Sequence, residues 1–140
     1  MDDVGRAWSK SRSHADGFCF SAQSPLCRVG LDLEALRPTE SLLRASELLL
    51  PSERAWAEEL PSALHWRRHL ALWVAKEAVL KALGQGFAFG LDQVELGLDS
   101  SGALVLRRLG GSEALARGWH LSVQEMTLEG RPYLVALATV

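Results

Sequence analysis

The sequence predicts an α+β domain in which an antiparallel sheet packs against one long helix. The longest helical pattern runs from Pro61-Ser62 to about Leu83, and Gly84 and Gly86 stop it. Strand-like runs lie on both sides of this helix in the chain. That order of strands, helices and strands is typical of an α+β domain. At 140 residues the chain has the length of one ordinary domain.

The segment before the helices predicts two strands. Residues 1–12 are polar and lack periodicity, so we interpret them as a flexible lead-in, with the folded domain at residues 13–140. Two short strand-like runs follow at residues 17–23 and 26–34. Ser24-Pro25 between them is a turn signal, which predicts a hairpin.

The rest of the chain predicts a helix start and a set of hairpins. Pro51 suits the first turn of a helix, which predicts a helix beginning there. Beyond the long helix, four runs read as strands: 94–98, 103–109, 119–127 and 133–139. Residues 99–102 and 128–131 carry the turn residues expected between paired strands.

Composition excludes several classes of protein. The net charge of −2 and the pI near 6.1 give no reason to expect a nucleic-acid partner. No apolar run reaches the roughly 18 residues that cross a bilayer, and the acidic start predicts no signal peptide and no membrane partner. Cys19 and Cys27 lack metal-ligand spacing. They fit apolar packing in a reducing compartment, so we expect a cytoplasmic protein.

Two acids stand on one face of a predicted strand. Alternation places Asp32 and Glu34 together with Gly30, and opposite the apolar residues of the same run. Carboxylates at this spacing lie roughly 7 Å apart, within reach of one hard cation and its waters. The same pattern also fits an ordinary solvated strand face that carries two acids.

A third acid lies on the long helix. Helical periodicity puts Glu77 in a stripe with Leu70, Trp73 and Lys81. An ionised carboxylate among large apolar side chains needs a partner or a metal ion. Lys81 at i+4 could also serve as a simple ion-pair partner. The opposite side of the helix is apolar as well, which predicts that the helix is covered on two sides: Leu72, Val79, Leu83.

Taken together, these segments resemble the paired signature of the 4′-phosphopantetheinyl transferase superfamily. That signature is a GxDxE strand, matched by Val29-Gly-Leu-Asp-Leu-Glu34, and a W/FxxKEAxxKxxG helix, matched by Trp73-Val-Ala-Lys-Glu-Ala-Val-Leu-Lys81-Ala-Leu-Gly84. Ser13-His14 resembles the SH element of the larger, surfactin-synthetase-activating branch, and Pro51-Ser-Glu-Arg54 resembles a helix start of that branch. The resemblance extends from Ser13 to the C-terminus.

The resemblance implies transfer of the phosphopantetheine arm of coenzyme A to a serine of an apo acyl or peptidyl carrier protein. The reaction would depend on Mg²⁺ and release adenosine 3′,5′-bisphosphate. Asp32, Glu34 and Glu77 are implied as the Mg²⁺ ligands, and Glu77 and Lys81 as catalytic residues. Lys81 would neutralise phosphate charge, and Lys76 would face the coenzyme A phosphates or the carrier.

The resemblance implies roles for two further residues, each with an ordinary alternative. His14 would contact the nucleotide of coenzyme A, or it is a loop histidine. Glu53 would help to deprotonate the carrier serine, or it is a first-turn acid that complements a helix dipole.

Members of the larger branch have two similar halves, with coenzyme A between them, and this chain resembles the second half. The basic residues with which the first half grips the nucleotide have no counterpart that we identify in residues 1–12. A second copy of the chain could supply the other wall, which would make a homo-oligomer, or another polypeptide could do so. Alternatively, the chain is a degenerate, non-catalytic module that binds carrier proteins or assists assembly.

Overall fold

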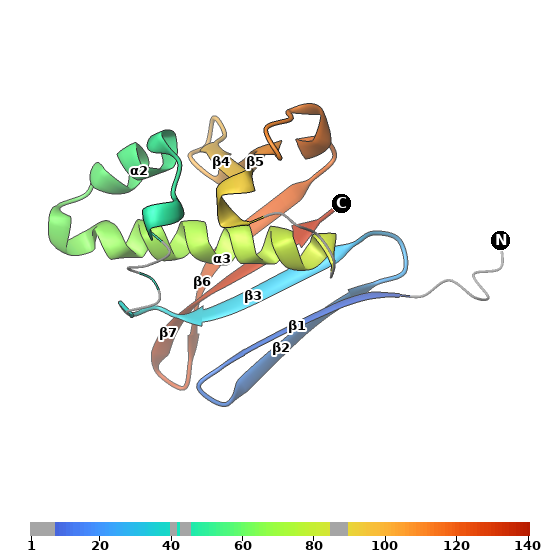
Figure 1. The fold of residues 1–140 in the computed structure, drawn as a ribbon. Helices are drawn as coiled ribbons and strands as arrows, with labels where there is room; N and C mark the ends of the chain where they lie inside the picture. Colours follow the sequence, from blue (N-terminus) through green and yellow to red (C-terminus); the bar gives the residue numbers. More distant parts are fainter. Residues whose placement is uncertain (1–7, 40–41, 43–45, 85–89) are drawn as a thin grey trace.

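The fold is described by a computed structural model, which describes residues 8–39, 42, 46–84 and 90–140. One long helix, α3, lies across a three-stranded sheet, and two separate two-stranded hairpins, β1–β2 and β4–β5, lie outside that sheet (Figure 1). The described elements, in chain order, are β1 (Ser9–Ala15), β2 (Phe18–Ser24), β3 (Val29–Ala35), α2 (Pro51–Glu58), α3 (His65–Leu83), β4 (Val94–Leu98), β5 (Leu104–Leu109), β6 (His120–Leu128) and β7 (Arg131–Thr139). Within the described part of the chain, no helix combines the length and apolarity that a membrane span requires.

The central sheet has the strand order β3-β7-β6, and every described pairing in it is antiparallel. Alternate residues of β7, Leu134, Ala136 and Ala138, are buried in the same cluster as the apolar residues of α3. The small alanines of the strand let the helix approach the sheet closely. The predicted α+β architecture, with an antiparallel sheet against a long helix, is confirmed.

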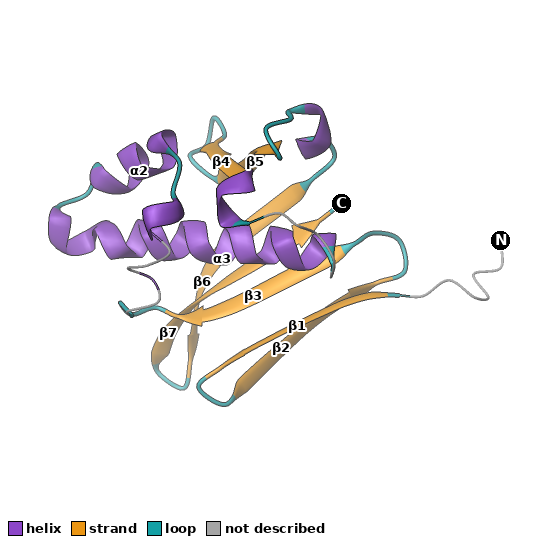
Figure 2. Cartoon of the chain, in the orientation of Figure 1, coloured by secondary structure: helices purple, strands orange, loops and turns teal. Residues whose placement is uncertain are grey.

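The helices and the later strands follow the predicted pattern (Figure 2). Helix α2 begins at Pro51, and α3 ends at Leu83. Gly84, with φ +87°, turns the chain out of the helix in a conformation that glycine adopts without strain. Strands β4 and β5 pair across the turn at residues 99–102, and β6 and β7 pair across the turn at residues 128–131.

The predicted hairpin between residues 17–23 and 26–34 is wrong. Strand β2 pairs with β1 through a turn at Asp16-Gly17, whereas β3 pairs with β7. Residues 9–12, which the sequence analysis placed in a flexible lead-in, therefore belong to a strand. This strand escaped recognition because its alternating residues are serines, which carry no apolar signal.

The three serines of β1 accept hydrogen bonds from the backbone N–H groups along the outer edge of β3. Their hydroxyl oxygens accept hydrogen bonds from backbone N–H groups: Val29 to Ser9 (3.0 Å), Leu31 to Ser11 (2.9 Å) and Leu33 to Ser13 (2.9 Å). A sheet edge otherwise exposes such donors, so the hairpin closes this side of β3 with side chains instead of a backbone ladder. The same bonds fix which residue of β1 lies beside each residue of β3.

Gly30 allows β3 to lie directly on α3. A Cβ atom at this position would meet the backbone carbonyl of Ala78 and the backbone nitrogen of Ala82. On the opposite face of β3, Leu31 and Leu33 are buried. The β1–β2 hairpin packs on that side of the sheet, where Phe18 of β2 contacts Tyr133 of β7 edge-on at 5.7 Å between ring centroids.

Candidate functional site

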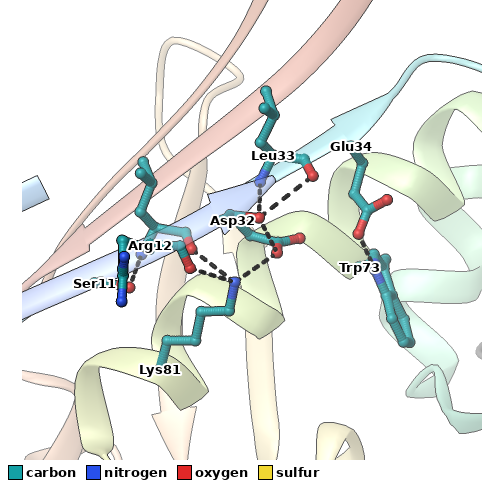
Figure 3. A network of polar contacts seen from close by, with 9 residues as sticks. Ser11, Arg12, Asp32, Leu33, Glu34, Trp73 and Lys81 are labelled. Carbon is teal, nitrogen blue, oxygen red and sulfur yellow. Dashed lines mark hydrogen bonds and ion pairs between the residues drawn. The ribbon is translucent and has the colours of Figure 1, made fainter. Parts of the chain in front are cut away.

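Strand β3 and helix α3 bring four predicted site residues to one place: Asp32, Glu34, Glu77 and Lys81. The strand face that carries Gly30 looks toward the helix, so Asp32 meets Lys81 and Glu34 meets Trp73 (Figure 3). The predicted strand parity is therefore confirmed. The predicted burial of the other side of α3 is confirmed too, because Leu72 and Val79 are fully buried.

The carboxylate of Asp32 is buried and only half satisfied. Its Oδ1 atom accepts hydrogen bonds from Lys81 Nζ at 3.0 Å and from Ser13 Oγ at 3.3 Å. Its Oδ2 atom is buried and has no hydrogen-bond partner among the described residues. Buried polar atoms nearly always have partners, and an unpartnered one commonly marks the place of an ion or water. Burial raises the pKa of Asp32 despite its contact with Lys81.

Lys81 joins the helix to two strands. Its ammonium donates to Asp32, to the backbone carbonyl of Leu31 at 2.9 Å and to that of Arg12 at 3.4 Å. The ion pair of Lys81 is therefore with Asp32. No ion pair between Lys81 and Glu77 is found among the described residues, so the simple i,i+4 pairing is not the arrangement of this site.

Glu34 and Glu77 complete the acidic side of the site. The indole N–H of Trp73 donates to Glu34 Oε1 at 3.4 Å. Burial raises the pKa of Glu34, and the negative charges of Asp32 and Glu77 raise it further. Burial also raises the pKa of Glu77, with a second contribution from Asp32. The charge of Asp32 thus raises the pKa of both glutamates, and a cation beside the three acids would offset this repulsion.

The three acids match a hard divalent cation in donor chemistry. All three acids offer carboxylate oxygens, the ligands that Mg²⁺ prefers, and Asp32 has a buried oxygen that nothing in the described chain occupies. The carboxylates are near enough to perturb one another. They are not gathered into a ligand cluster, since no group of three metal-ligating side chains with suitable geometry occurs among the described residues. The metal assignment thus stays a prediction.

Glu53 and Lys76 lie elsewhere and form a closed, buried pair. Lys76 Nζ donates to Glu53 Oε1 at 2.7 Å and to the carbonyl of Leu91 at 3.0 Å. Glu53 also accepts from the backbone N–H groups of Leu50 and Leu96, at 2.9 Å each. Both side chains are almost fully buried. These contacts differ from the predicted ones. Lys76 is buried against Glu53 and does not face an open surface, and both oxygens of Glu53 already accept hydrogen bonds from the protein.

His14 lies on the exposed face of β1, away from the serines that contact β3. The structure does not bring its side chain into contact with the acids, so its predicted role rests on the resemblance. Sequence reasoning assigned no site role to Ser13 or Trp73, which hold Asp32 and Glu34 in place. The alternation of serines at 9, 11 and 13 was the signal that could have revealed Ser13.

Comparisons with known proteins agree with the signature. The family model described as the 4′-phosphopantetheinyl transferase superfamily matches residues 28–138. The 4′-phosphopantetheinyl transferase HetI of Nostoc sp. is 36% identical over 87 residues, covering 61% of this chain and 36% of that protein. A holo-[acyl-carrier-protein] synthase of Solidesulfovibrio magneticus is 37% identical over 108 residues, covering 68% of this chain and 85% of that protein.

The fold is also that of solved synthases. The structure of a holo-(acyl-carrier-protein) synthase from Bacillus anthracis, in complex with CoA (3′,5′-ADP), superposes with a TM-score of 0.60 at 24% identity, covering 81% of this chain and 95% of that one. The chain spans only about a third of the length of the first two curated relatives, at 36% and 34%. On the family match over residues 28–138, the chain belongs to the 4′-phosphopantetheinyl transferase superfamily.

Proposed function

We propose that the chain is a Mg²⁺-dependent 4′-phosphopantetheinyl transferase. Its substrates would be coenzyme A and an apo acyl or peptidyl carrier protein. The observation that carries this proposal is the buried, unpartnered Oδ2 of Asp32 beside Lys81, Glu34 and Glu77, within the segment that matches the family. When bound there by Asp32, Glu34 and Glu77, Mg²⁺ would supply positive charge that offsets the pyrophosphate of coenzyme A.

The reaction breaks a phosphoanhydride bond and forms a phosphoester bond. The hydroxyl oxygen of the carrier serine forms a bond to the phosphorus that bears pantetheine, and the bond from that phosphorus to the bridging pyrophosphate oxygen breaks. Adenosine 3′,5′-bisphosphate leaves. Phosphoryl transfer depends mainly on positioning and on charge neutralisation, and Lys81 offers a fixed ammonium for both.

The serine proton needs an acceptor on the same surface. Glu53, the predicted candidate, is buried and uses both oxygens in hydrogen bonds. Glu77 is only partly buried, and burial raises its pKa, which suits a proton acceptor. We therefore assign the base role to Glu77.

Transfer of labelled phosphopantetheine to apo carrier proteins tests this function. Asp32→Asn and Glu77→Gln should each reduce the rate by about 100-fold or more, because each removes charge from the reacting centre. The matched control is Glu125→Gln on β6. Glu125 is exposed and forms no hydrogen bond or ion pair with Asp32, Glu77 or Lys81 among the described residues, so this variant should keep the parent rate. Absence of transfer by the parent with every carrier tested would favour the non-catalytic module of the same fold.

Two further expectations belong to this proposal. Trp8 and Leu26 are large apolar side chains that stand 51% and 81% exposed at the base of the β1–β2 hairpin. Such surface supports association with a second copy or a second chain that completes the coenzyme A pocket, which mass measurement in solution would check. Cys19 is exposed and Cys27 is partly buried, so the predicted apolar packing is wrong for Cys19; the cytoplasmic location stays part of the proposal.

A further inference from the structure

An open groove lies between helix α2 and the β4–β5 hairpin. Both elements lie on one side of α3, whereas β1 and β2 lie on the other side (Figure 1). The groove has a volume of about 670 Å³, within the range of roughly 300–1,000 Å³ that is typical of small-molecule sites. Asp32, Glu34 and Glu77 are not among its described lining residues, so it is separate from the candidate metal site.

Much of the groove wall is apolar. Large apolar side chains from α2, α3 and the hairpin line it: Trp56, Leu72, Leu96, Leu98 and Leu104. Trp56 is fixed by Arg68, whose guanidinium lies 4.6 Å from the centroid of the indole ring and donates to the backbone carbonyl of Trp56 at 2.6 Å. An apolar surface that is already ordered binds an apolar group at a smaller entropic cost.

The charged residues of the groove are unequally paired. Each acid described in its wall forms an ion pair with a basic residue of the protein: Glu53 with Lys76, Glu59 with Arg68, and Glu95 with Arg108. Arg107, which also lines the groove, takes part in no ion pair between described residues. Its positive charge therefore remains available to attract an anion into the groove.

The side chain of Arg107 is held against β4. Its Nη2 atom donates to the backbone carbonyl of Leu98 at 2.7 Å. Gly97 makes room for it, because a Cβ atom at this position would collide with the Nε, Cδ and Cζ atoms of Arg107. The bond to Leu98 uses one of the five N–H donors of the guanidinium, so donors remain for a ligand.

We propose that this groove binds a small carboxylate that carries an apolar chain or ring. The carboxylate binds Arg107, whose planar guanidinium matches carboxylate geometry, and the apolar part packs against Trp56 and Leu98. One unpaired cation beside apolar walls suits a single negative charge better than the several charges of a nucleotide. The groove shares no described lining residue with the proposed Mg²⁺ ligands, so this inference does not depend on the proposed function.

Titration calorimetry with octanoate and 1-octanol, which differ in charge and share a chain length, tests the assignment. Octanoate should bind the parent saturably, and 1-octanol about tenfold more weakly, the usual effect of losing a charge-assisted contact. Arg107→Gln should weaken octanoate about tenfold and change 1-octanol less than about twofold. Ala55→Trp, which fills the groove from an exposed position of α2, should weaken both ligands. Arg117→Gln, an exposed charge outside the groove, is the control and should change neither.

Several results would overturn the proposal. Equal affinity of the parent for the two ligands, or unchanged octanoate affinity in Arg107→Gln, would remove Arg107 from the site. Absence of saturable octanoate binding in the parent would refute the site itself. A capped apolar peptide that displaces octanoate and binds more tightly would also refute it, because the groove would then be a peptide site. Arg107 and Ala55 are exposed, so thermal unfolding should show both variants folded.

Discussion

Helix α3 carries two lysine–carboxylate pairs, little more than one turn apart, with opposite character. The pair of Lys76 with Glu53 is sealed, and each of its polar atoms reaches a protein partner. The pair of Lys81 with Asp32 is open: the side chain of Lys81 is 32% exposed, and Asp32 keeps one oxygen without a partner in the described chain.

The difference lies in what surrounds each pair. Around Glu53, the residue before helix α2 and a residue of strand β4 each supply a backbone N–H, so that both carboxylate oxygens accept hydrogen bonds from the protein. Around Asp32, the neighbouring strand offers one serine hydroxyl, and two further acids add negative charge. A lysine–carboxylate pair thus stabilises the fold at one place and, at the other, leaves a carboxylate oxygen without a partner in the described chain.

The largest expected effect comes from breaking the sealed pair. Lys76→Met leaves the buried Glu53 without its counter-charge, and we expect a loss of about 3–5 kcal/mol in the free energy of unfolding, measured by urea denaturation. Lys81→Met should lose less, about 1–2 kcal/mol, because Asp32 already has a raised pKa and can take up a proton. Equal losses in the two variants would show that the two pairs do not differ as described.

A second test concerns the pair of Lys81 with Asp32 and measures how Mg²⁺ and pH change the stability of the protein. Asp32, Glu34 and Glu77 have raised pKa values in the fold, so the metal-free protein should lose stability as pH rises from about 4 through those values. Mg²⁺ binds the charged acids, and at 100 times its dissociation constant it should add about 2.7 kcal/mol near pH 7 and almost nothing near pH 4.

Thermal unfolding with and without Mg²⁺ at both pH values measures this effect. Asp32→Asn should abolish the Mg²⁺ shift, whereas Lys76→Met should keep it in the fraction that folds. A shift of the same size in Asp32→Asn would remove Asp32 from the proposed ligands.

A third test alters the close contact between β3 and α3, which should affect the pair of Lys81 with Asp32 and not the pair of Lys76 with Glu53. Gly30→Ala places a methyl group against the backbone of Ala78, which should lower the free energy of unfolding by about 1–3 kcal/mol. Because this pushes β3 from α3, Mg²⁺ affinity should fall as well, while the Lys76 pair, which involves no residue of β3, should stay intact. Urea denaturation and Mg²⁺ titration measure the two effects, and unchanged Mg²⁺ affinity would contradict the link.

The smallest expected effect concerns the turn that holds β1 against the sheet. Asp16 accepts hydrogen bonds from Arg37 and Tyr133, and these lower its pKa. Its contribution should be present above pH 4 and fade as pH falls through the lowered pKa. Asp16→Asn, which tolerates the positive φ of this turn, should reduce the melting temperature slightly at pH 7 and not at pH 2. An equal reduction at both pH values would mean that the charge is not responsible.

Much of the site could be predicted because it depends on local periodicity. Alternation placed Asp32 with Glu34 on the side of Gly30, and helical spacing aligned Trp73, Glu77 and Lys81, as the structure confirms. The C-terminal end of α3 at Leu83 also followed from Gly84, whereas its start lies at His65 and not at the predicted Pro61-Ser62, because residues 62–64 form a separate 3-10 turn. Such features need only the geometry of one strand or one helix.

Other features required contacts between distant segments. Lys76 and Lys81 look equally suited to phosphate in the sequence, and only the packing of α2 and β4 decided which one is buried. Strand β1 was missed because it contacts β3 through a row of serine hydroxyls, and alternating serines give no hydrophobic signal.

The sequence alone determined the residues that share a face and the family signature that they form. The tertiary structure decided which faces meet, which carboxylate oxygen has no partner among the described residues, and that the backbone of β1 lies beside the Lys81–Asp32 pair. The reason is physical: side-chain direction follows from the local backbone, whereas burial and pairing depend on segments that only folding brings together.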